Sequence, residues 1–341
     1  MRHILLVLTL WAAVACGWEE ENTSYTPVIK GLNLVAAPGH PDSASFGAIQ
    51  KTGANWVAVI PYAFLRPGET EIHFNTSGQW AGERKEGIIL AVDQAHAIGL
   101  KVMLKPHVWV MGQGWMGDFT LSDEEKWQKW QEAYTRYLIF YADLSDSLGV
   151  EMLCIGTEMR QVVQERPAYW PELIDTVKDV YRGKLTYAAN WDNYENVGFW
   201  NELDYIGIDA YFPLSDDPLP SAEELRNAWK PIAEHMANFA GSIGKQVIFT
   251  EYGYKSTTYT AAAHWEKRER IWEEQAQVAG LEGLYTTFWK GKHWFDGGFL
   301  WKWHPTAETM KRGEITEPYT VQNKRGLLTL KEWYGAEVMS E

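Results

Sequence analysis

The feature that most constrains this chain is an alternation of short apolar runs with amphipathic stretches along most of its length. Runs that are apolar along most of their length are typical of parallel strands covered on both faces. Such runs predict strands at Lys30–Val35, Asn55–Pro61, Lys101–His107, Glu151–Glu158, Leu185–Trp191, Tyr205–Phe212, Gln246–Tyr252 and Gly297–Trp303. Strand and helix alternating eight times predict an α/β fold, a closed (β/α)8 barrel. A doubly wound open sheet is the alternative.

The clearest helix is expected from about Ser122 to Ser147. Ser122 and Glu125 have the spacing of a capping box at its start. Apolar and aromatic residues then recur at helical spacing and share one face, which we interpret as a core-facing stripe. The stripe consists of Trp127, Trp130, Tyr134, Tyr137, Tyr141 and Leu148.

Two further helices complete the second half of the pattern. Ser221 and Glu224 form another capping box ahead of the seventh strand, and Pro231 is expected to kink or break that helix. A long helix is expected from about His264 to Trp289, before the eighth strand. The chain has no linker-like or low-complexity segment, so one domain is expected over residues 27–341.

The N-terminus has the pattern of a secretion signal. An apolar run from Ile4 to Val14 is too short to span a bilayer and fits a signal-peptide core. The next residues resemble a lipobox with Cys16 as the lipidated residue, although Ala13 stands where Leu is commoner. An acidic run, Glu19–Glu21, resembles an export tag of surface lipoproteins. We therefore expect a signal peptide at 1–15 and a lipidated tether at 16–26. An ordinary cleaved signal is the alternative.

These features imply a lipoprotein of the bacterial cell envelope, in the outer membrane, whose only membrane contact is the N-terminal anchor. Acidic residues outnumber basic ones by 45 to 31, and the net charge of −14 disfavours nucleic acid and anionic substrates. The surplus of aromatic residues, 19 of them Trp, suggests core rings and also rings that stack on sugars. A neutral oligo- or polysaccharide is therefore the expected partner. We expect the protein itself to be a monomer.

No cofactor or metal is predicted. The segment from Gly112 to Gly117 matches a dinucleotide fingerprint by letter, but bulky Trp115 and the separate helix start favour a loop over the barrel mouth. The nine His residues are scattered, so no metal site is indicated. Cys154 is the sole Cys after Cys16. It lies in an apolar strand, where a small core residue is the simplest interpretation.

Polar residues at the carboxyl ends of the strands are the expected site, because barrel enzymes act at that face. Glu158 and Glu251 stand out, since each ends a strongly apolar strand and needs partners there. A salt bridge to Arg160 or Lys255 is the structural alternative for either one alone. The remaining candidates for substrate binding are Asn33, Tyr62, His107, Trp109, Arg160, Asn190, Trp191, Asp209, Tyr211, Trp301 and Trp303.

Three segments, Ile155–Glu158, Thr250–Tyr254 and Phe299–Trp303, resemble glycoside hydrolase family 113. The resemblance implies a retaining β-1,4-mannanase or related β-mannosidase, with Glu158 as acid/base and Glu251 as nucleophile. Most members of the wider clan carry Asn before the acid/base, where it binds the sugar 2-hydroxyl. Here that residue is Thr157, which leaves the partner of the 2-hydroxyl open.

The retaining mechanism needs one protonated and one ionised carboxyl group. Tyr211, Arg160 or His107 could donate to Glu251, and burial with the charge of Glu251 should keep Glu158 protonated. Of Trp301 and Trp303, we expect only one to face the sugar. Two other functions stay open: the same mechanism on another β-glycan, and a carbohydrate-binding lipoprotein that has lost catalysis.

Overall fold

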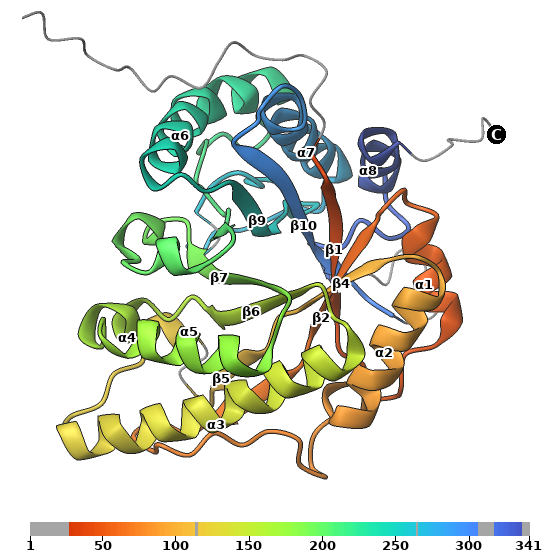
Figure 1. Cartoon of the computed structure of the whole chain (residues 1–341). Coiled ribbons are helices and arrows are strands. Elements are labelled where there is room, and N and C mark those ends of the chain that lie inside the picture. Colours follow the sequence, from red (N-terminus) through yellow and green to blue (C-terminus); the bar gives the residue numbers. More distant parts are fainter. Residues whose placement is uncertain (1–26, 113–114, 264, 306–316, 336–341) are drawn as a thin grey trace, which may run out of the picture.

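Parallel strands close into a barrel in which β1 pairs with both β2 and β10 (Figure 1). The computed structural model describes residues 27–112, 115–263, 265–305 and 317–335, and eight strands of this part form the barrel in the order β1-β10-β9-β8-β7-β6-β4-β2. The predicted (β/α)8 barrel is confirmed, and the open-sheet alternative is wrong. The barrel strands are β1 (Ile29–Val35), β2 (Trp56–Ile60), β4 (Lys101–Leu104), β6 (Met152–Thr157), β7 (Lys184–Asn190), β8 (Ile206–Asp209), β9 (Val247–Tyr252) and β10 (Phe295–Trp303).

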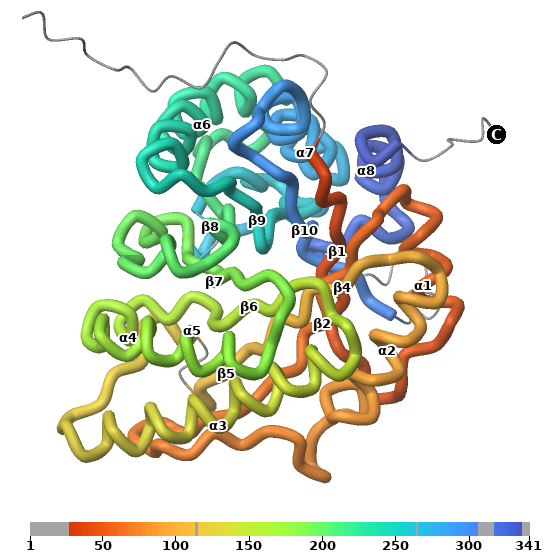
Figure 2. Tube along the Cα trace, in the orientation of Figure 1, coloured from red at the N-terminus to blue at the C-terminus, as the bar shows by residue number. Residues whose placement is uncertain are grey.

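The α-helices lie around the outside of the barrel, as the Cα trace in Figure 2 also shows. They are α1 (Ser43–Gln50), α2 (Lys85–Ala97), α3 (Glu124–Leu148), α4 (Arg160–Glu165), α5 (Tyr169–Val180), α6 (Ala222–Ile243), α7 (Glu274–Phe288) and α8 (Gly326–Tyr334). Short 3-10 turns lie in the loops at Ala81–Glu83, Met116–Asp118, Tyr194–Asn196 and Trp200–Glu202.

Each predicted strand overlaps a barrel strand, but the third prediction divides in two. Its first half is β4, and its end belongs to β5 (His107–Val110), which pairs in parallel with β3 (Tyr62–Leu65) as a separate two-stranded sheet. Pro61 and Pro106 separate these short strands from the barrel strands before them. Proline has no N–H to donate, so it interrupts a strand ladder.

Side-chain alternation in the strands produces two cores. Trp56 and Ala58 of β2 lie in the cluster inside the barrel, whereas Val57 and Val59 belong to the larger core between barrel and helices. Cys154 is fully buried inside the barrel, as the sequence predicts. The aromatic stripe of α3 packs in the larger core, with Leu148 at its margin.

The helix starts show where sequence signals compete. At α3 the N-cap is Asp123, whose side chain accepts a hydrogen bond from the Lys126 N–H at 2.9 Å. The predicted Ser122 capping box is therefore wrong, because Asp123 is an equally good cap one residue closer to the helix. The capping box of Ser221 and Glu224 at α6 is confirmed.

The predicted break at the proline and the predicted start of the long helix also differ from the structure. Helix α6 runs through Pro231 without a break, since its buried face packs against the core on both sides of the proline. Helix α7 begins only at Glu274, so the predicted start was too early; His264 itself lies outside the described residues. The preceding segment forms a loop in which the Arg270 guanidinium donates to backbone carbonyls, including that of Tyr259.

The predicted signal peptide, Cys16 and the tether fall in residues 1–26, outside the described part of the chain. Within that part, none of the helices combines the length and apolar character needed to cross a bilayer.

The two sequence-predicted caps provide a matched test of the helix starts. Ser221→Ala removes a side chain that accepts from a helix N–H, so it should lower the free energy of unfolding by about 1 kcal/mol. Ser122→Ala removes only a contact with the Asp123 carboxylate and should cost less than half as much. Urea denaturation measures both, and equal losses would contradict the assigned caps.

Candidate active site

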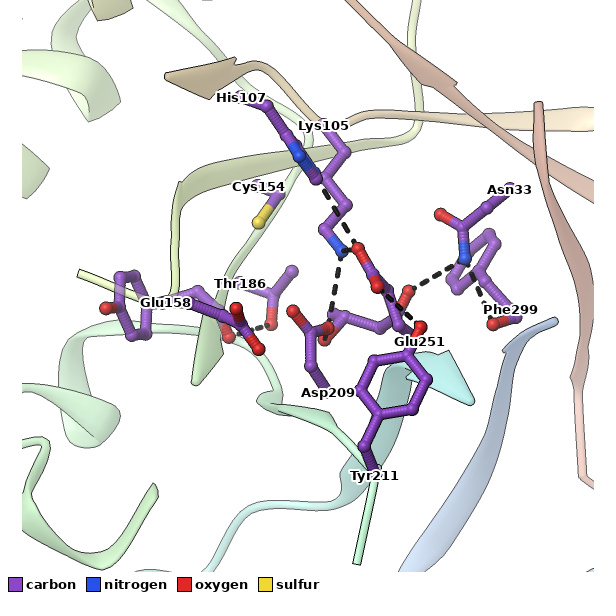
Figure 3. A network of polar contacts seen from close by, with 12 residues as sticks. Asn33, Lys105, His107, Cys154, Glu158, Thr186, Asp209, Tyr211, Glu251 and Phe299 are labelled. Atoms are coloured by element: carbon purple, nitrogen blue, oxygen red, sulfur yellow. Dashed lines mark hydrogen bonds and ion pairs between the residues drawn. The ribbon is translucent and has the colours of Figure 1, made fainter. Parts of the chain in front are cut away.

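The two predicted glutamates face one cavity at the carboxyl ends of the strands (Figure 3). Glu158 directly follows β6 and Glu251 is the fifth residue of β9. Both line a cavity of about 170 Å³. The other lining residues are Tyr62, His107, Val108, Trp109, Trp115, Met116, Thr157 and Trp301.

An irregularity in the sheet precedes each glutamate and sets its direction. The pairing of β6 with β7 shifts between Cys154 and Thr157, and the pairing of β8 with β9 shifts so that Asp209 stands opposite Glu251. Such bulges re-aim side chains at the ends of barrel strands. Glu158 also has a φ of 50°, in the left-handed region that non-glycine residues rarely adopt. Strain of this kind persists where the surrounding structure holds it.

Both oxygens of Glu251 are engaged by donors. The Lys105 ammonium lies 2.6 Å from Oε1, and the Tyr211 hydroxyl donates to Oε2 at 2.7 Å. His107 Nε2 lies 3.8 Å from Oε1, and burial followed by the charge of Lys105 lowers the pKa of His107 well below its ordinary value. A neutral ring and a cation therefore surround a carboxylate held in one orientation, which stabilises its negative charge.

Glu158 has the opposite environment. Burial, and then the charges of Asp209 and Glu251, raise the pKa of this carboxyl to about 8. The Trp115 indole N–H donates to Oε2 and opposes the shift. At neutral pH Glu158 is therefore mostly protonated and can give up a proton.

A second cavity of about 540 Å³ adjoins the first, because Trp115 and Glu158 line both. The residues that it adds are Arg160, Asn190, Trp191, Asp192 and Trp265. Trp191 and Trp265 stack with their ring centroids 5.8 Å apart and their planes 11° apart. The Arg160 guanidinium lies over the Trp115 ring, 4.9 Å from its centroid. The combined cleft thus carries aromatic faces on both sides of Glu158.

Most of the residues predicted for substrate binding lie along these cavities. Tyr62, His107, Trp109 and Trp301 line the smaller one, and Arg160, Asn190 and Trp191 line the larger one. Tyr211 contacts Glu251 directly, whereas Asp209 is buried beneath it.

Three expectations about these residues need correction. Trp303 is buried in the core between barrel and helices, so Trp301 is the ring that faces the cleft. The Asn33 amide donates to the backbone carbonyls of Thr250 and Phe299, and Asn33 lines neither cavity. Arg160 pairs with acidic side chains of neighbouring loops and not with Glu251.

The sequence prediction missed Lys105, Trp115 and Trp265. Lys105 is a charged residue at the end of the apolar run that forms β4, which is the signal that identified the two glutamates. Trp115 and Trp265 lie in loops, where no periodic pattern points to them. Within the described ranges, no three His, Cys, Asp or Glu side chains gather in a group that could hold a metal ion.

Comparisons with known proteins identify the family and support the fold. Residues 40–324 match the model of Glycoside Hydrolase Family 113. The structure is similar to the GH113 β-mannanase AaManA from Alicyclobacillus acidocaldarius, at 25% identity, with a TM-score of 0.79 and coverage of 91% of this chain and 98% of that chain. A second GH113 β-1,4-mannanase matches at 25% identity with a TM-score of 0.77, covering 91% of this chain and all of that one.

More distant similarity concerns the fold alone. A β-glucuronidase from Ruminococcus gnavus matches at 14% identity with a TM-score of 0.59, over 90% of this chain and 50% of that chain. The comparison with curated proteins found no match.

The two tryptophans of β10 offer a matched test of the cleft. Trp301→Ala should lower kcat/KM on an oligosaccharide by about 100-fold and change the free energy of unfolding little, because the ring lines the cavity. Trp303→Ala should cost about 3–5 kcal/mol of unfolding free energy, since it empties a core site. Kinetics and urea denaturation of both variants measure this contrast. Equal losses of activity and stability in Trp301→Ala would make that ring a core residue.

Proposed function

The chain belongs to Glycoside Hydrolase Family 113, and we propose that this glycoside hydrolase cleaves β-1,4-mannosidic bonds with retention of configuration. The observation that carries the proposal is the unlike environment of two carboxyl groups in one cavity. Glu158 has a pKa raised to about 8, whereas Glu251 contacts the Lys105 cation. Groups with such divergent environments suit acid and nucleophile roles.

In the first step, a Glu251 oxygen attacks the anomeric carbon of the sugar, and the bond from that carbon to the leaving oxygen breaks. Glu158 transfers its proton to the leaving oxygen as the bond breaks. In the second step, Glu158 takes a proton from water, the water oxygen bonds to the anomeric carbon, and the ester bond to Glu251 breaks. Both glutamates then return to their starting states.

Mannan is the substrate class that the available observations support best. The GH113 structures similar to this chain are β-mannanases, and the net charge of −14 favours a neutral polymer. Cavities on both sides of Glu158 leave room for sugars on both sides of the scissile bond, which suits cleavage within a chain. A panel of mannan, glucomannan, xylan and cellulose oligosaccharides tests this substrate. A faster rate on xylan or cellulose would support another β-glycan, and binding without hydrolysis would support the carbohydrate-binding alternative.

Two unsatisfied polar atoms are candidates for contacts with the sugar hydroxyls. Thr157 Oγ1 and His107 Nε2 are buried, belong to residues that line the smaller cavity, and have no hydrogen-bond partner among the described residues. A buried polar group without a partner is costly, so a bound hydroxyl would relieve this cost. Thr157 holds the position where the wider clan has Asn. Thr157 and His107 are both candidates to bind the sugar 2-hydroxyl.

We also propose the envelope location and the domain limits that the sequence predicts, with residues 1–15 removed and Cys16 lipidated. The catalytic domain then covers residues 27–341 as a monomer. Cys16→Ser should move the protein from the membrane fraction to the soluble fraction of cells, and an unchanged distribution would reject the lipid anchor.

The acid/base assignment predicts a specific rescue. Glu158→Ala should still form the glycosyl-enzyme from a substrate with an activated aryl leaving group, because such a group departs without protonation. The intermediate should accumulate, and added azide should restore turnover because a small anion attacks without a general base. NMR of the product should show the β-glycosyl azide.

Glu251→Ala is the matched control for this rescue. It removes the nucleophile and should lower turnover by about 1,000-fold or more, and azide entering its space should give the α-glycosyl azide. An α-azide from Glu158→Ala and a β-azide from Glu251→Ala would mean that the two roles are reversed.

A further inference from the structure

A buried lysine lies between two carboxylates beneath the cleft (Figure 3). Lys105 Nζ is 2.6 Å from Glu251 Oε1 and 3.3 Å from Asp209 Oδ1. The Thr250 hydroxyl donates to the same Asp209 oxygen at 2.7 Å. Lys105 and Asp209 are 0% and 1% exposed, and neither lines the two cavities of the cleft. They therefore act on Glu251 from below and not on the sugar.

The barrel brings these groups together from three strands. Lys105 directly follows β4, Asp209 is the last residue of β8, and the shifted pairing of β8 with β9 sets Asp209 opposite Glu251. A fully buried ammonium group is stable only with a counterion. Burial alone would lower the pKa of Lys105, but the charges of Asp209 and Glu251 outweigh this effect and raise that pKa above its ordinary value.

Double displacement changes the counterions of Lys105 during the reaction. When Glu251 forms the ester with the sugar, its negative charge is lost, and the ammonium group would be left buried beside a neutral ester. Removing one partner from a buried ion pair is strongly destabilising. Asp209 is the second carboxylate within reach of Lys105 Nζ.

Building on the proposed function, we propose that Lys105 and Asp209 are positioning residues that balance the charge of Glu251 through the reaction. In the free enzyme Lys105 is shared by both carboxylates, and in the glycosyl-enzyme it is held by Asp209 alone. The cation orients the attacking oxygen in the first step, and Asp209 stabilises the cation once that oxygen is bonded to carbon.

The coupling among the groups supports this exchange. Burial, and then the charge of Glu251, raise the pKa of Asp209 to about 7 in the free enzyme. Ester formation removes the charge of Glu251, so the pKa of Asp209 falls and its carboxylate becomes the stronger partner of Lys105 at that stage. When the ester forms, Glu158 gains a negative charge by giving its proton to the departing oxygen, and Glu251 loses one. The summed charge of these two groups, Lys105 and Asp209 therefore does not change.

The arrangement predicts that substitutions of Asp209 and Lys105 shift the pKa of Glu158 in opposite directions. Around Glu158 the negative charge of Asp209 raises its pKa and the positive charge of Lys105 lowers it. Asp209→Asn should therefore lower the pKa of Glu158, and Lys105→Met should raise it, each by about one unit. Other charged or titratable groups line the cavities with Glu158 or interact with it, and they are the same in both variants. They are Glu251 on β9, Arg160 on α4, Tyr187 on β7, Asp192 after β7, His107 on β5 and Tyr62 on β3.

The experiment measures the pKa of Glu158 by ¹³C NMR of carboxyl-labelled protein, with Glu158→Gln to assign the resonance. It also measures the pH dependence of kcat/KM on mannohexaose, whose leaving group needs the acid. Asp209→Asn should move the alkaline limb to lower pH and Lys105→Met to higher pH. Both variants should lower kcat by about 100-fold with a much smaller change in KM, because neither side chain touches the sugar.

Two further variants serve as controls. The double variant Lys105→Met, Asp209→Asn removes the ion pair as a unit, so its Glu158 pKa should return toward that of the wild type even if one single variant folds poorly. Lys184→Met breaks an ion pair with Asp204 at the amino-terminal end of β7. It should change neither the alkaline limb of the pH profile of kcat/KM nor the value of kcat.

Shifts in the same direction, no shifts, or a wild-type kcat in Asp209→Asn would overturn the proposal. A wild-type protein that cleaves no mannan oligosaccharide would instead reject the proposed substrate, and the NMR titration would still test the electrostatic pair without any substrate.

Discussion

The ion pair between Lys105 and Glu251 is the interaction on which the site depends. Both side chains lie at the ends of apolar strands, and a buried charge there is costly without an oppositely charged partner. Their contact requires the carboxyl ends of β4 and β9 to meet across the barrel interior, which an open sheet would not bring about. Barrel closure and the charged site therefore depend on each other.

The same closure explains why the two glutamates differ. Glu251 contacts the buried cation and the Tyr211 hydroxyl, whereas Glu158 accepts a hydrogen bond from the Trp115 indole and has its pKa raised by burial and by the charges of Asp209 and Glu251. The difference results from the two shifts in strand register and from the left-handed backbone at Glu158. Regular alternation along β9 would put Thr250 and Glu251 on opposite faces of the sheet. In the structure both reach the same buried cluster, because Thr250 donates to Asp209 and Glu251 pairs with Lys105.

The sequence predicted the strands and the two glutamates for one reason: long apolar runs are rare outside buried strands, and a charge at the end of such a run is conspicuous. Applied consistently, that argument would also have identified Lys105. The bulges, the division of the third strand at Pro106 and the orientation of Trp301 depend on pairing between strands distant in the sequence. The start of α7 depends on the tertiary contacts of Arg270, and local sequence patterns do not reveal such contacts.

The aromatic residues show how the barrel supports a costly site. Most of the large rings are in the core, where Trp130, Tyr134 and Trp170 pack behind β6, the strand that leads to Glu158. The Tyr134 hydroxyl donates to the Ile155 carbonyl, and the Tyr187 hydroxyl accepts the Met159 N–H, so the strand is tied on both sides of the strained glutamate. Close packing of this kind resists relaxation of a strained residue. The buried rings thus support the cleft indirectly, because they hold Glu158 in place beside the rings that line the cleft.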